Sequence, residues 1–188
     1  MIKSKSDLSV YLIADKKSRA NLGGFWSRTT DEIWQFHKLL RRLELASNFR
    51  VNIVHRSYLQ FRFKRKSVRL GFTIPINVTG PGLSLPHFGS ITINGGARIG
   101  ANCRIHNGVN IGTEAGKSNA APTIGDNCYI GPGAKIFGDI VIGPNTVIGA
   151  NAVVNKSFPE GNQTIAGIPA KVISQKSSEG LLIKGFQL

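Results

Sequence analysis

The stretch from Ile124 to Val154 reads IGDNCY-IGPGAK-IFGDIV-IGPNTV-IGANAV-V, so that an aliphatic residue returns at every sixth position. A period of six matches neither the 3.6 residues of a helical turn nor the two of an ordinary strand, and a short regular repeat indicates a solenoid. Glycine often follows the aliphatic residue, where a tight corner needs its conformational freedom. We therefore predict one short strand and one turn per hexad, with three hexads closing a triangular coil. The same period runs through an upstream set: Ile93, Ile99, Ile105 and Ile111.

A second position of the hexad is also regular. Generally small side chains stand four residues after each aliphatic: Ala97, Cys103, Val109, Cys128, Ala134, Ile140, Thr146 and Ala152. Together the two positions predict a mainly β fold, a left-handed parallel β-helix, over residues 71–174. Both cysteines fall at the small inward position, where a free cysteine behaves as a compact hydrophobe. Two cysteines form neither a disulfide framework nor a set of zinc ligands, so we interpret both as structural.

The repeat is irregular at two places. The step from Ile111 to Ile124 is thirteen residues, so the polar segment 112–123 predicts a protruding loop. Loops on a rigid scaffold are where binding and catalysis concentrate, although a tolerated surface insertion is the alternative. Counting six residues back from Ile93 reaches His87, where an inward aliphatic is expected. Either the register changes there or a histidine replaces a core residue.

The composition limits the class of protein. Of the 188 residues, 41% are hydrophobic, which excludes a wholly disordered chain, and the 22 glycines follow no period of three, which excludes collagen. No stretch approaches the roughly 18 apolar residues of a membrane span. The N-terminus shows no apolar segment of a secretory signal. We therefore expect a cytoplasmic protein.

The net charge of +14 is unevenly distributed, because residues 1–70 hold 16 basic and 5 acidic side chains and residues 71–188 hold 8 and 5. We predict a helical region over 1–70, with one helix opening at Thr30-Asp31-Glu32 and a basic amphipathic helix over 51–70. Such a helix indicates contact with the cytoplasmic face of a membrane. Helices that cap the repeat and leave their charges in solvent are the alternative that we favour slightly. No motif supports nucleic-acid binding.

Residues 71–174 resemble the serine acetyltransferase branch of the hexapeptide-repeat acyltransferases, and within it the shorter capsule and surface-polysaccharide O-acetyltransferases. The motifs that carry the resemblance are His87-Phe-Gly-Ser-Ile-Thr-Ile-Asn, Ile105-His-Asn-Gly-Val-Asn-Ile-Gly-Thr, Ile130-Gly-Pro-Gly-Ala-Lys-Ile-Phe-Gly and Ala166-Gly-Ile-Pro-Ala-Lys. The resemblance implies an acetyl-CoA-dependent O-acetyltransferase that forms a homotrimer, with active sites between neighbouring prisms. Residues 175–188 then form a C-terminal tail, as a short helix or a loose extension.

Acetyl transfer to a hydroxyl group needs a base that takes the hydroxyl proton, and histidine titrates near neutrality. His87 matches the catalytic histidine of the family, so we expect it to be the general base. His106 and Glu114 are candidate substrate-binding residues. The alternative for His106 is packing at a subunit interface. Either Glu114 or a backbone carbonyl group is available to orient the ring of His87. The resemblance also implies a cofactor groove lined by small residues and two lysines: Gly131, Gly133, Ala134, Gly149, Ala150, Lys156 and Lys171. The alternative is that the glycines only shape the corners and that the lysines only face solvent.

Departures from the family pattern bear on the acceptor. Serine acetyltransferases carry an Arg-His pair before the proline that closes the loop, and the aligned residues here are Ala120 and Ala121. Two alanines cannot hold a carboxylate. We therefore expect the acceptor to be a sugar hydroxyl of a capsular or other surface polysaccharide or its precursor. Serine O-acetylation in cysteine biosynthesis is the alternative.

Two classes without acetyl transfer remain open. A β-helical metalloenzyme of the carbonic-anhydrase type needs three histidines on one metal ion. The repeat region holds only His87 and His106, so we expect no metal. A non-catalytic scaffold is the other class, and for it replacing His87 would change no activity.

Overall fold

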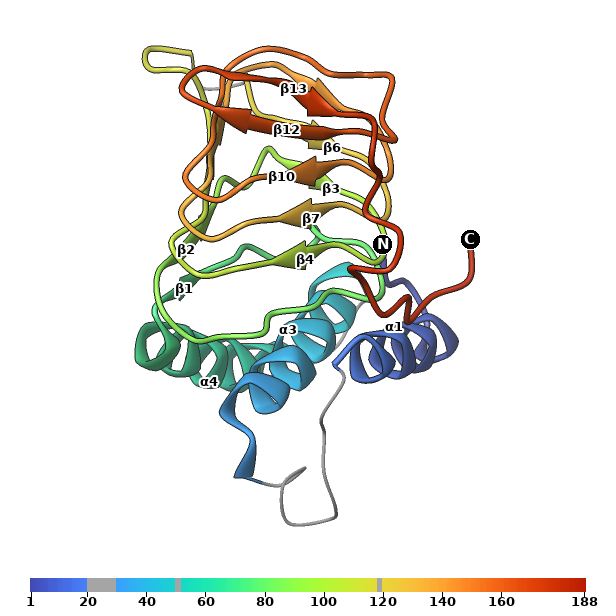
Figure 1. Ribbon diagram of the computed structural model, residues 1–188. Helices are drawn as coiled ribbons and strands as arrows, with labels where there is room; N and C mark the ends of the chain where they lie inside the picture. Colours follow the sequence, from blue (N-terminus) through green and yellow to red (C-terminus); the bar gives the residue numbers. More distant parts are fainter. Residues whose placement is uncertain (20–29, 50–51, 118–119) are drawn as a thin grey trace.

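The computed structural model of the chain describes residues 1–19, 30–49, 52–117 and 120–188. Within them, helices α1 (Lys5–Lys17), α3 (Glu32–Asn48) and α4 (Ile53–Leu70) form a layer beneath a stack of short strands (Figure 1). The strands follow in chain order: β1 (Phe72–Thr73), β2 (Ile91–Ile93), β3 (Arg98–Ile99), β4 (Arg104–Ile105), β5 (Asn110–Gly112), β6 (Thr123–Ile124), β7 (Tyr129–Ile130), β8 (Lys135–Phe137), β9 (Val141–Ile142), β10 (Val147–Ile148), β11 (Val153–Val154), β12 (Thr164–Gly167) and β13 (Ala170–Ser174).

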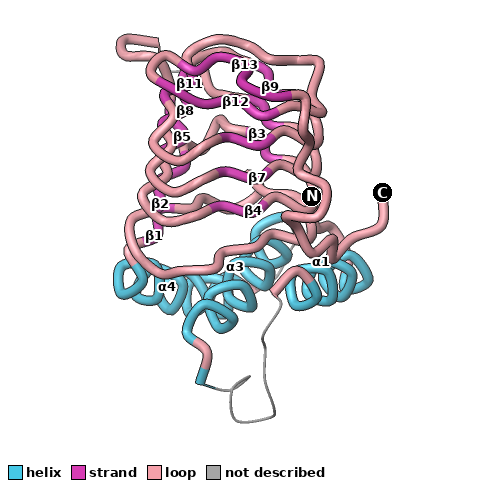
Figure 2. The backbone as a smooth tube through the Cα atoms, viewed as in Figure 1, coloured by secondary structure: helices cyan, strands magenta, loops and turns pink. Residues whose placement is uncertain are grey.

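The described strands form three sheets around one core (Figure 2). Face A holds β1, β2, β5, β8 and β11, face B holds β3, β6 and β9, and face C holds β4, β7, β10 and β12, with β13 antiparallel to β12. From β2 to β11 the chain passes from face A to B to C and back. Ile93 pairs with Ile111, and Ile130 with Ile148, eighteen residues further on in each case, so three hexads make one coil. The predicted left-handed parallel β-helix is confirmed.

Both regular positions of the hexad fill the inside of the coils. The aliphatic residues Ile105, Ile130 and Ile136 are fully buried. At the small position, Cys103 and Cys128 are buried and unbridged, as expected. A hydrogen bond with Cys128, and then burial, raises the pKa of the Cys103 thiol well above its usual value. A thiol that stays protonated is a poor nucleophile, which agrees with a structural role.

The helices cap the first coil of the β-helix, which is the arrangement that the sequence analysis favoured slightly. Phe36 and Leu40 of α3 belong to the same hydrophobic core as Phe72 of β1. The rings of Phe36 and Phe72 are 5.1 Å apart, edge to face. Asp31 caps α3 as predicted, and Gly71 ends α4 in the left-handed conformation. No helix in the described ranges has the length and apolarity to cross a membrane.

Helix α1 lies within the helical region predicted over 1–70, although its bounds were not predicted. Its junction with the first coil is polar. The side chain of Arg41 is fully buried and donates from Nε to Asp15 of α1 at 2.8 Å. Asp15 Oδ1 in turn accepts from the backbone N–H groups of Gly82 and Leu83, both at 2.9 Å. Arg41 also donates to the carbonyl oxygen of Gly80. This buried pair therefore ties two helices to one turn of the β-helix.

The C-terminal tail, residues 175–188, is extended and runs back toward α1 along the edge between faces B and C (red in Figure 1). Ser178 Oγ donates to the carbonyl oxygen of Asn127, and the N–H of Phe186 donates to Asn102 Oδ1. Asparagines in the left-handed conformation turn this edge, and their side-chain amides hydrogen-bond from coil to coil: Asn102, Asn127, Asn145 and Asn162. The tail therefore forms no helix, and hydrogen bonds to several coils hold it along this edge.

Candidate active site

His87 lies where the register of the hexads changes. Ser84 forms a parallel bridge on face C, which puts Leu85 at the inward position of that face, while Ile93 holds the inward position of face A. Leu85 and Ile93 are both buried but stand eight residues apart instead of six. The two additional residues enlarge the corner 86–90, and His87 is exposed there. A change of register is therefore the correct alternative, and the histidine replaces no core residue.

The corner that carries His87 begins a stack of corners between faces C and A. We call this the C–A edge, made of residues 86–90, 106–109, 131–134 and 149–152. Backbone hydrogen bonds join each corner to the next: Gly108 N–H to Ser90 O at 2.6 Å, Gly133 N–H to Asn107 O at 3.0 Å, and Asn151 N–H to Pro132 O at 2.8 Å.

Five of the predicted cofactor-binding residues lie together on the C–A edge: Gly131, Gly133, Ala134, Gly149 and Ala150. The glycines have a packing reason to be there. A Cβ on Gly131 would lie 2.8 Å from the backbone nitrogen of Ala150, and one on Gly149 would lie 2.8 Å from the Cβ of Ala166. Glycine thus lets the corners stack closely. Gly133, Gly149 and Ala150 reach the solvent, whereas Gly131 and Ala134 are buried, so the side chain of Ala134 fills the core and does not face a groove as expected.

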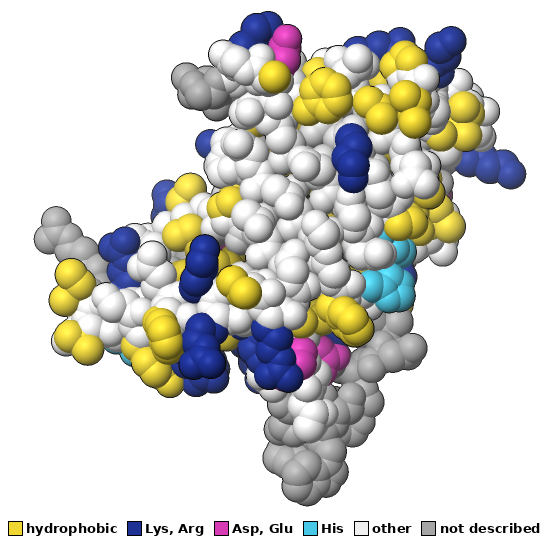
Figure 3. All heavy atoms as spheres, turned by 90° about the vertical axis from the view of Figure 1, so that its left-hand side faces the viewer, with side chains coloured by type: hydrophobic (Ala, Val, Ile, Leu, Met, Phe, Trp, Pro, Cys, Tyr) yellow, Lys and Arg dark blue, Asp and Glu magenta, His cyan; other side chains and the backbone are white. Residues whose placement is uncertain are grey.

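His106 lies on the corner directly above His87. Its ring centre is 5.8 Å from that of His87 and 5.0 Å from that of Tyr129. Figure 3 shows histidine side chains gathered on the surface at this end of the β-helix, near the helical layer. His106 is only 8% exposed, and Arg104 Nε lies 3.2 Å from its Nε2 atom.

The surroundings of His106 keep its ring neutral. Burial, followed by the charges of Arg104 and His87, lowers the pKa of His106 to about 4. Because Arg104 donates to Nε2, the single ring proton of the neutral imidazole is on Nδ1. Near pH 7, the imidazole of His106 is therefore an uncharged polar group beside His87.

The sequence analysis missed three side chains near this corner. Arg104 and Tyr129 pair across face C, and each precedes an inward isoleucine, so both point outward beside the C–A edge. Lys135 Nζ donates to the carbonyl oxygen of Gly108 at 2.6 Å. The sequence does indicate their direction, because the residue before the aliphatic residue of each hexad points outward in every coil. Among the described residues, no three His, Cys, Asp or Glu side chains come together as metal ligands would.

The two candidate lysines lie on different edges. Lys171 of β13 pairs with Ala166, which packs against Gly149, so Lys171 stands at the far end of the C–A edge. Lys156 follows β11 of face A and lies at the edge between faces A and B, with Nζ 5.5 Å from the ring centre of Phe158. Of these two candidates, Lys171 is therefore the one that lies with the glycine corners within a single chain.

The insertion after Ile111 protrudes as predicted, between β5 of face A and β6 of face B (yellow in Figure 1). Its placement separates Glu114 from His87, because the loop and the C–A edge lie on different edges of the prism. Glu114 is exposed and forms an ion pair with Lys117 of the same loop at 2.9 Å. Within a single chain, Glu114 therefore does not orient the ring of His87.

Residues 121–156 match the family described as bacterial transferase hexapeptide (six repeats). The chain carries a bacterial transferase hexapeptide repeat. The chain is 41% identical over 99 residues to a serine acetyltransferase of Staphylococcus xylosus, covering 51% of this chain and 44% of that protein. A serine acetyltransferase of Mycobacterium tuberculosis is 38% identical over 104 residues, covering 54% and 44%.

Solved structures with the hexapeptide repeat extend the likeness to the helical layer. The crystal structure of Neisseria gonorrhoeae serine acetyltransferase matches 91% of this chain and 68% of its own, with 27% identity and a TM-score of 0.73. Serine acetyltransferase from Brucella abortus in complex with coenzyme A matches 92% and 68%, with 26% identity and a TM-score of 0.70. The chain spans less than half the length of the two curated relatives described above.

Proposed function

We propose that this protein is an acetyl-CoA-dependent O-acetyltransferase in which His87 is the general base. The observation that carries the proposal is the C–A edge, where an exposed histidine begins a stack of glycine corners on a hexapeptide repeat. The likeness to serine acetyltransferases, one of them in complex with coenzyme A, supports the donor.

In the proposed reaction, His87 takes the proton of the acceptor hydroxyl as its oxygen attacks the thioester carbonyl carbon. The carbon–sulfur bond then breaks, and His87 returns the proton to the departing thiolate. The acetyl ester and free CoA are the products. His87 suits this role because it is exposed at a corner and the neighbouring His106 is neutral, so His106 adds no positive charge to the site.

The small exposed corners suit a CoA arm. Gly133 and Gly149 are partly exposed and Ala150 is exposed, so a pantetheine chain can approach the backbone there. Lys171, exposed at the end of this edge, is placed to meet a phosphate group as a compact charge. In their own chain, Lys156 and Glu114 lie at the edge between faces A and B, away from His87. They can belong to the same active site only if a neighbouring subunit supplies them. This is the reason to propose a homotrimer with sites between subunits.

L-Serine is the acceptor that the relatives favour, and this differs from the polysaccharide expected from the sequence. Ala120 and Ala121 offer no cation to a carboxylate. Arg104, however, stands beside His106 and forms no ion pair with an acidic side chain among the described residues. We propose that Arg104 takes the role of carboxylate partner that the two alanines cannot fill.

A sugar hydroxyl is the second candidate acceptor, and the observation that favours it is the apolar closing segment Ala120-Ala121-Pro122. A neutral glycan has no carboxylate, so it needs no cation from this segment and no replacement cation from Arg104. A cytoplasmic location stays a prediction in either case.

The test measures thiol release from acetyl-CoA by the wild type, His87→Ala and Arg104→Met, with L-serine and a panel of sugars as acceptors. We expect His87→Ala to lower kcat by about 10²–10⁴-fold and to keep its fold, because the side chain is exposed. Gln175→Ala, on the exposed tail, is the control that should keep wild-type rates. Full activity of His87→Ala would overturn the proposal that His87 is the general base. Absence of activity in the wild type with every acceptor would favour the non-catalytic scaffold.

The same assay separates the two acceptors. If serine is the acceptor, Arg104→Met raises KM for serine far more than it lowers kcat, because a ground-state contact is lost. Turnover with a sugar and none with serine would select the second candidate.

A further inference from the structure

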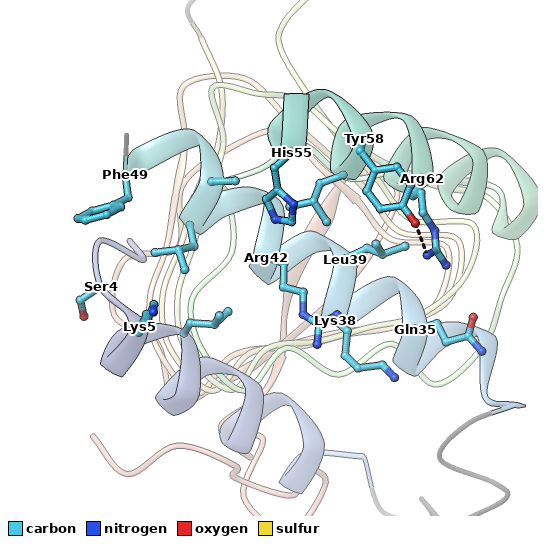
Figure 4. A pocket seen from close by; sticks show the side chains of 14 residues that line it. Ser4, Lys5, Gln35, Lys38, Leu39, Arg42, Phe49, His55, Tyr58 and Arg62 are labelled. Atoms are coloured by element: carbon cyan, nitrogen blue, oxygen red, sulfur yellow. Dashed lines mark hydrogen bonds between the residues drawn. The ribbon is translucent and has the colours of Figure 1, made fainter. Parts of the chain in front are cut away.

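The helical layer contains a cavity that the proposed active site does not use. It has a volume of about 910 Å³ and lies between α1, α3 and α4 (Figure 4). The volume falls within the range of ligand cavities, roughly 300–1,000 Å³. Much of its lining is aliphatic: Leu8, Leu39, Leu45, Ala46 and Leu59.

All charged side chains among the described lining residues are basic: Lys5, Lys38, Arg42 and Arg62, with His55 beside them. In the described part of the chain, no ion pair joins Lys38, Arg42 or Arg62 to an acidic side chain. Burial, followed by the charge of Arg42, lowers the pKa of Lys38, and the charge of Asp31 offsets only part of this shift. The cavity therefore combines an apolar lining with unpaired cations.

The outer face of α4 continues this surface. A second hollow of about 380 Å³ shares Leu39, Tyr58 and Arg62 with the cavity and adds Phe61 and three cations. Of these, Lys66 and Arg69 form ion pairs with Glu32, and Arg65 forms none among the described residues. Val54, Phe61 and Val68 recur at seven-residue spacing on α4 and are 72%, 60% and 71% exposed. The helix contains no acidic residue and six Lys or Arg: Arg56, Arg62, Lys64, Arg65, Lys66 and Arg69. We call the cavity, the second hollow and this face of α4 the basic groove.

The presence of both cations and exposed apolar side chains in the basic groove favours one kind of binding partner over others. A second copy of the chain would bring two sets of like charges together, which is unfavourable. A nucleic acid would satisfy the cations but leave Val54, Phe61 and Val68 in water. An acidic phospholipid supplies both a phosphate group and hydrocarbon, and basic helices with exposed apolar side chains bind at such interfaces.

We propose that the basic groove docks the protein on the acidic phospholipids of a membrane surface. Lys38, Arg42 and Arg62 meet the lipid phosphates, and Phe61 and Val68 enter the interface. On the proposed function, docking brings the active site close to the lipid surface, because Gly89 of the His87 corner donates to the carbonyl oxygen of Leu70 at the end of α4.

The test is sedimentation of the full chain with vesicles of phosphatidylcholine alone and of phosphatidylcholine with phosphatidylglycerol, without acetyl-CoA. Arg42→Glu/Arg62→Glu reverses two charges in the groove. Lys176→Glu/Lys184→Glu makes the same change in net charge on the exposed tail and is the matched control. Phe61→Ser/Val68→Ser removes exposed apolar groups at constant charge, so it tests the groove even where the first variant fails to fold.

We expect wild type and the tail variant to bind acidic vesicles, and both groove variants to lose at least about tenfold in partition coefficient. Equal loss in the two charge-reversed variants, unchanged binding of Phe61→Ser/Val68→Ser, or no wild-type binding would overturn the proposal. Tighter binding to duplex DNA than to acidic vesicles, or displacement by inorganic phosphate alone, would also overturn it. Because the assay contains no acetyl donor, its failure is distinct from failure of the proposed acetyl transfer.

Discussion

At the scale of single residues, His106 shows how neighbours set a protonation state. Its pKa of about 4 results from burial, then from the charges of Arg104 and His87. An unperturbed histidine titrates near 6.5, so between roughly pH 4 and 6.5 the unfolded chain binds a proton that the folded chain refuses. This residue therefore lowers the stability of the fold as pH falls through that window, and its contribution is constant above it.

We predict that an NMR titration of the imidazole signals will place His106 near pH 4 in the wild type. Arg104→Met should move this midpoint upward, because removing a neighbouring cation favours the charged imidazole. His55, which lines the cavity of the helical layer, provides the control signal in the same spectra. An unchanged His106 midpoint in Arg104→Met would contradict the contact between the two side chains.

At the scale of the element, the corners of the β-helix differ in whether they tolerate a side chain. A Cβ on Gly125 would lie 2.8 Å from the backbone nitrogen of Pro144 in the next coil, which cannot move away alone. A Cβ on Gly95 meets nothing within 4 Å. The tight corners are those that stack directly on another coil.

We predict that Gly125→Ala lowers the free energy of unfolding by about 1–3 kcal/mol, as overpacking does elsewhere. Gly95→Ala, the same change at an open corner, should stay within about 0.5 kcal/mol of the wild type. Urea denaturation followed by circular dichroism measures both. Equal losses in the two variants would show that corner stacking is not what requires glycine.

The helices illustrate which elements a pattern can reveal. α3 was predicted from Asp31 and the apolar stripe that follows it, and Asp31 caps it as expected. α1 lies inside the predicted helical region 1–70, but its bounds were not predicted, because its contact with the rest of the molecule includes the buried Asp15. A helix that packs through a carboxylate carries no hydrophobic period.

At the scale of the whole molecule, the buried pair of Arg41 and Asp15 adds a polar connection between the helical layer and the β-helix to the shared hydrophobic core. Although burial by itself raises the pKa of Asp15, the charge of Arg41 and the contact with His37 hold it below its ordinary value. The carboxylate is therefore stabilising above its ordinary pKa of about 3.9, and this contribution is lost as pH falls through the lowered pKa of the folded state.

We predict that Arg41→Ala costs about 3–5 kcal/mol in free energy of unfolding, because it removes the guanidinium that neutralises two buried carboxylates, Asp15 and Glu44. The double variant Asp15→Asn/Arg41→Met should recover part of this loss. Asp15→Asn should also unfold with a weaker dependence on pH below about pH 4 than the wild type. Thermal melts across the acid range measure the slope, and identical slopes would exclude Asp15 as its source.

The sequence by itself determined the repeat. The six-residue period predicts the coils, the inward place of Cys103 and Cys128 and the loop after Ile111, because a solenoid imposes the same environment on every hexad and so writes it into the chain. Only the tertiary structure decided how the irregular residues lie. His87 points outward because two additional residues enlarge its corner, and Arg104 and Tyr129 contact the neighbouring His106. Asp15 and Arg41 meet across different helices. Contacts between residues distant in sequence leave no period, so their geometry depends on how coils and helices stack.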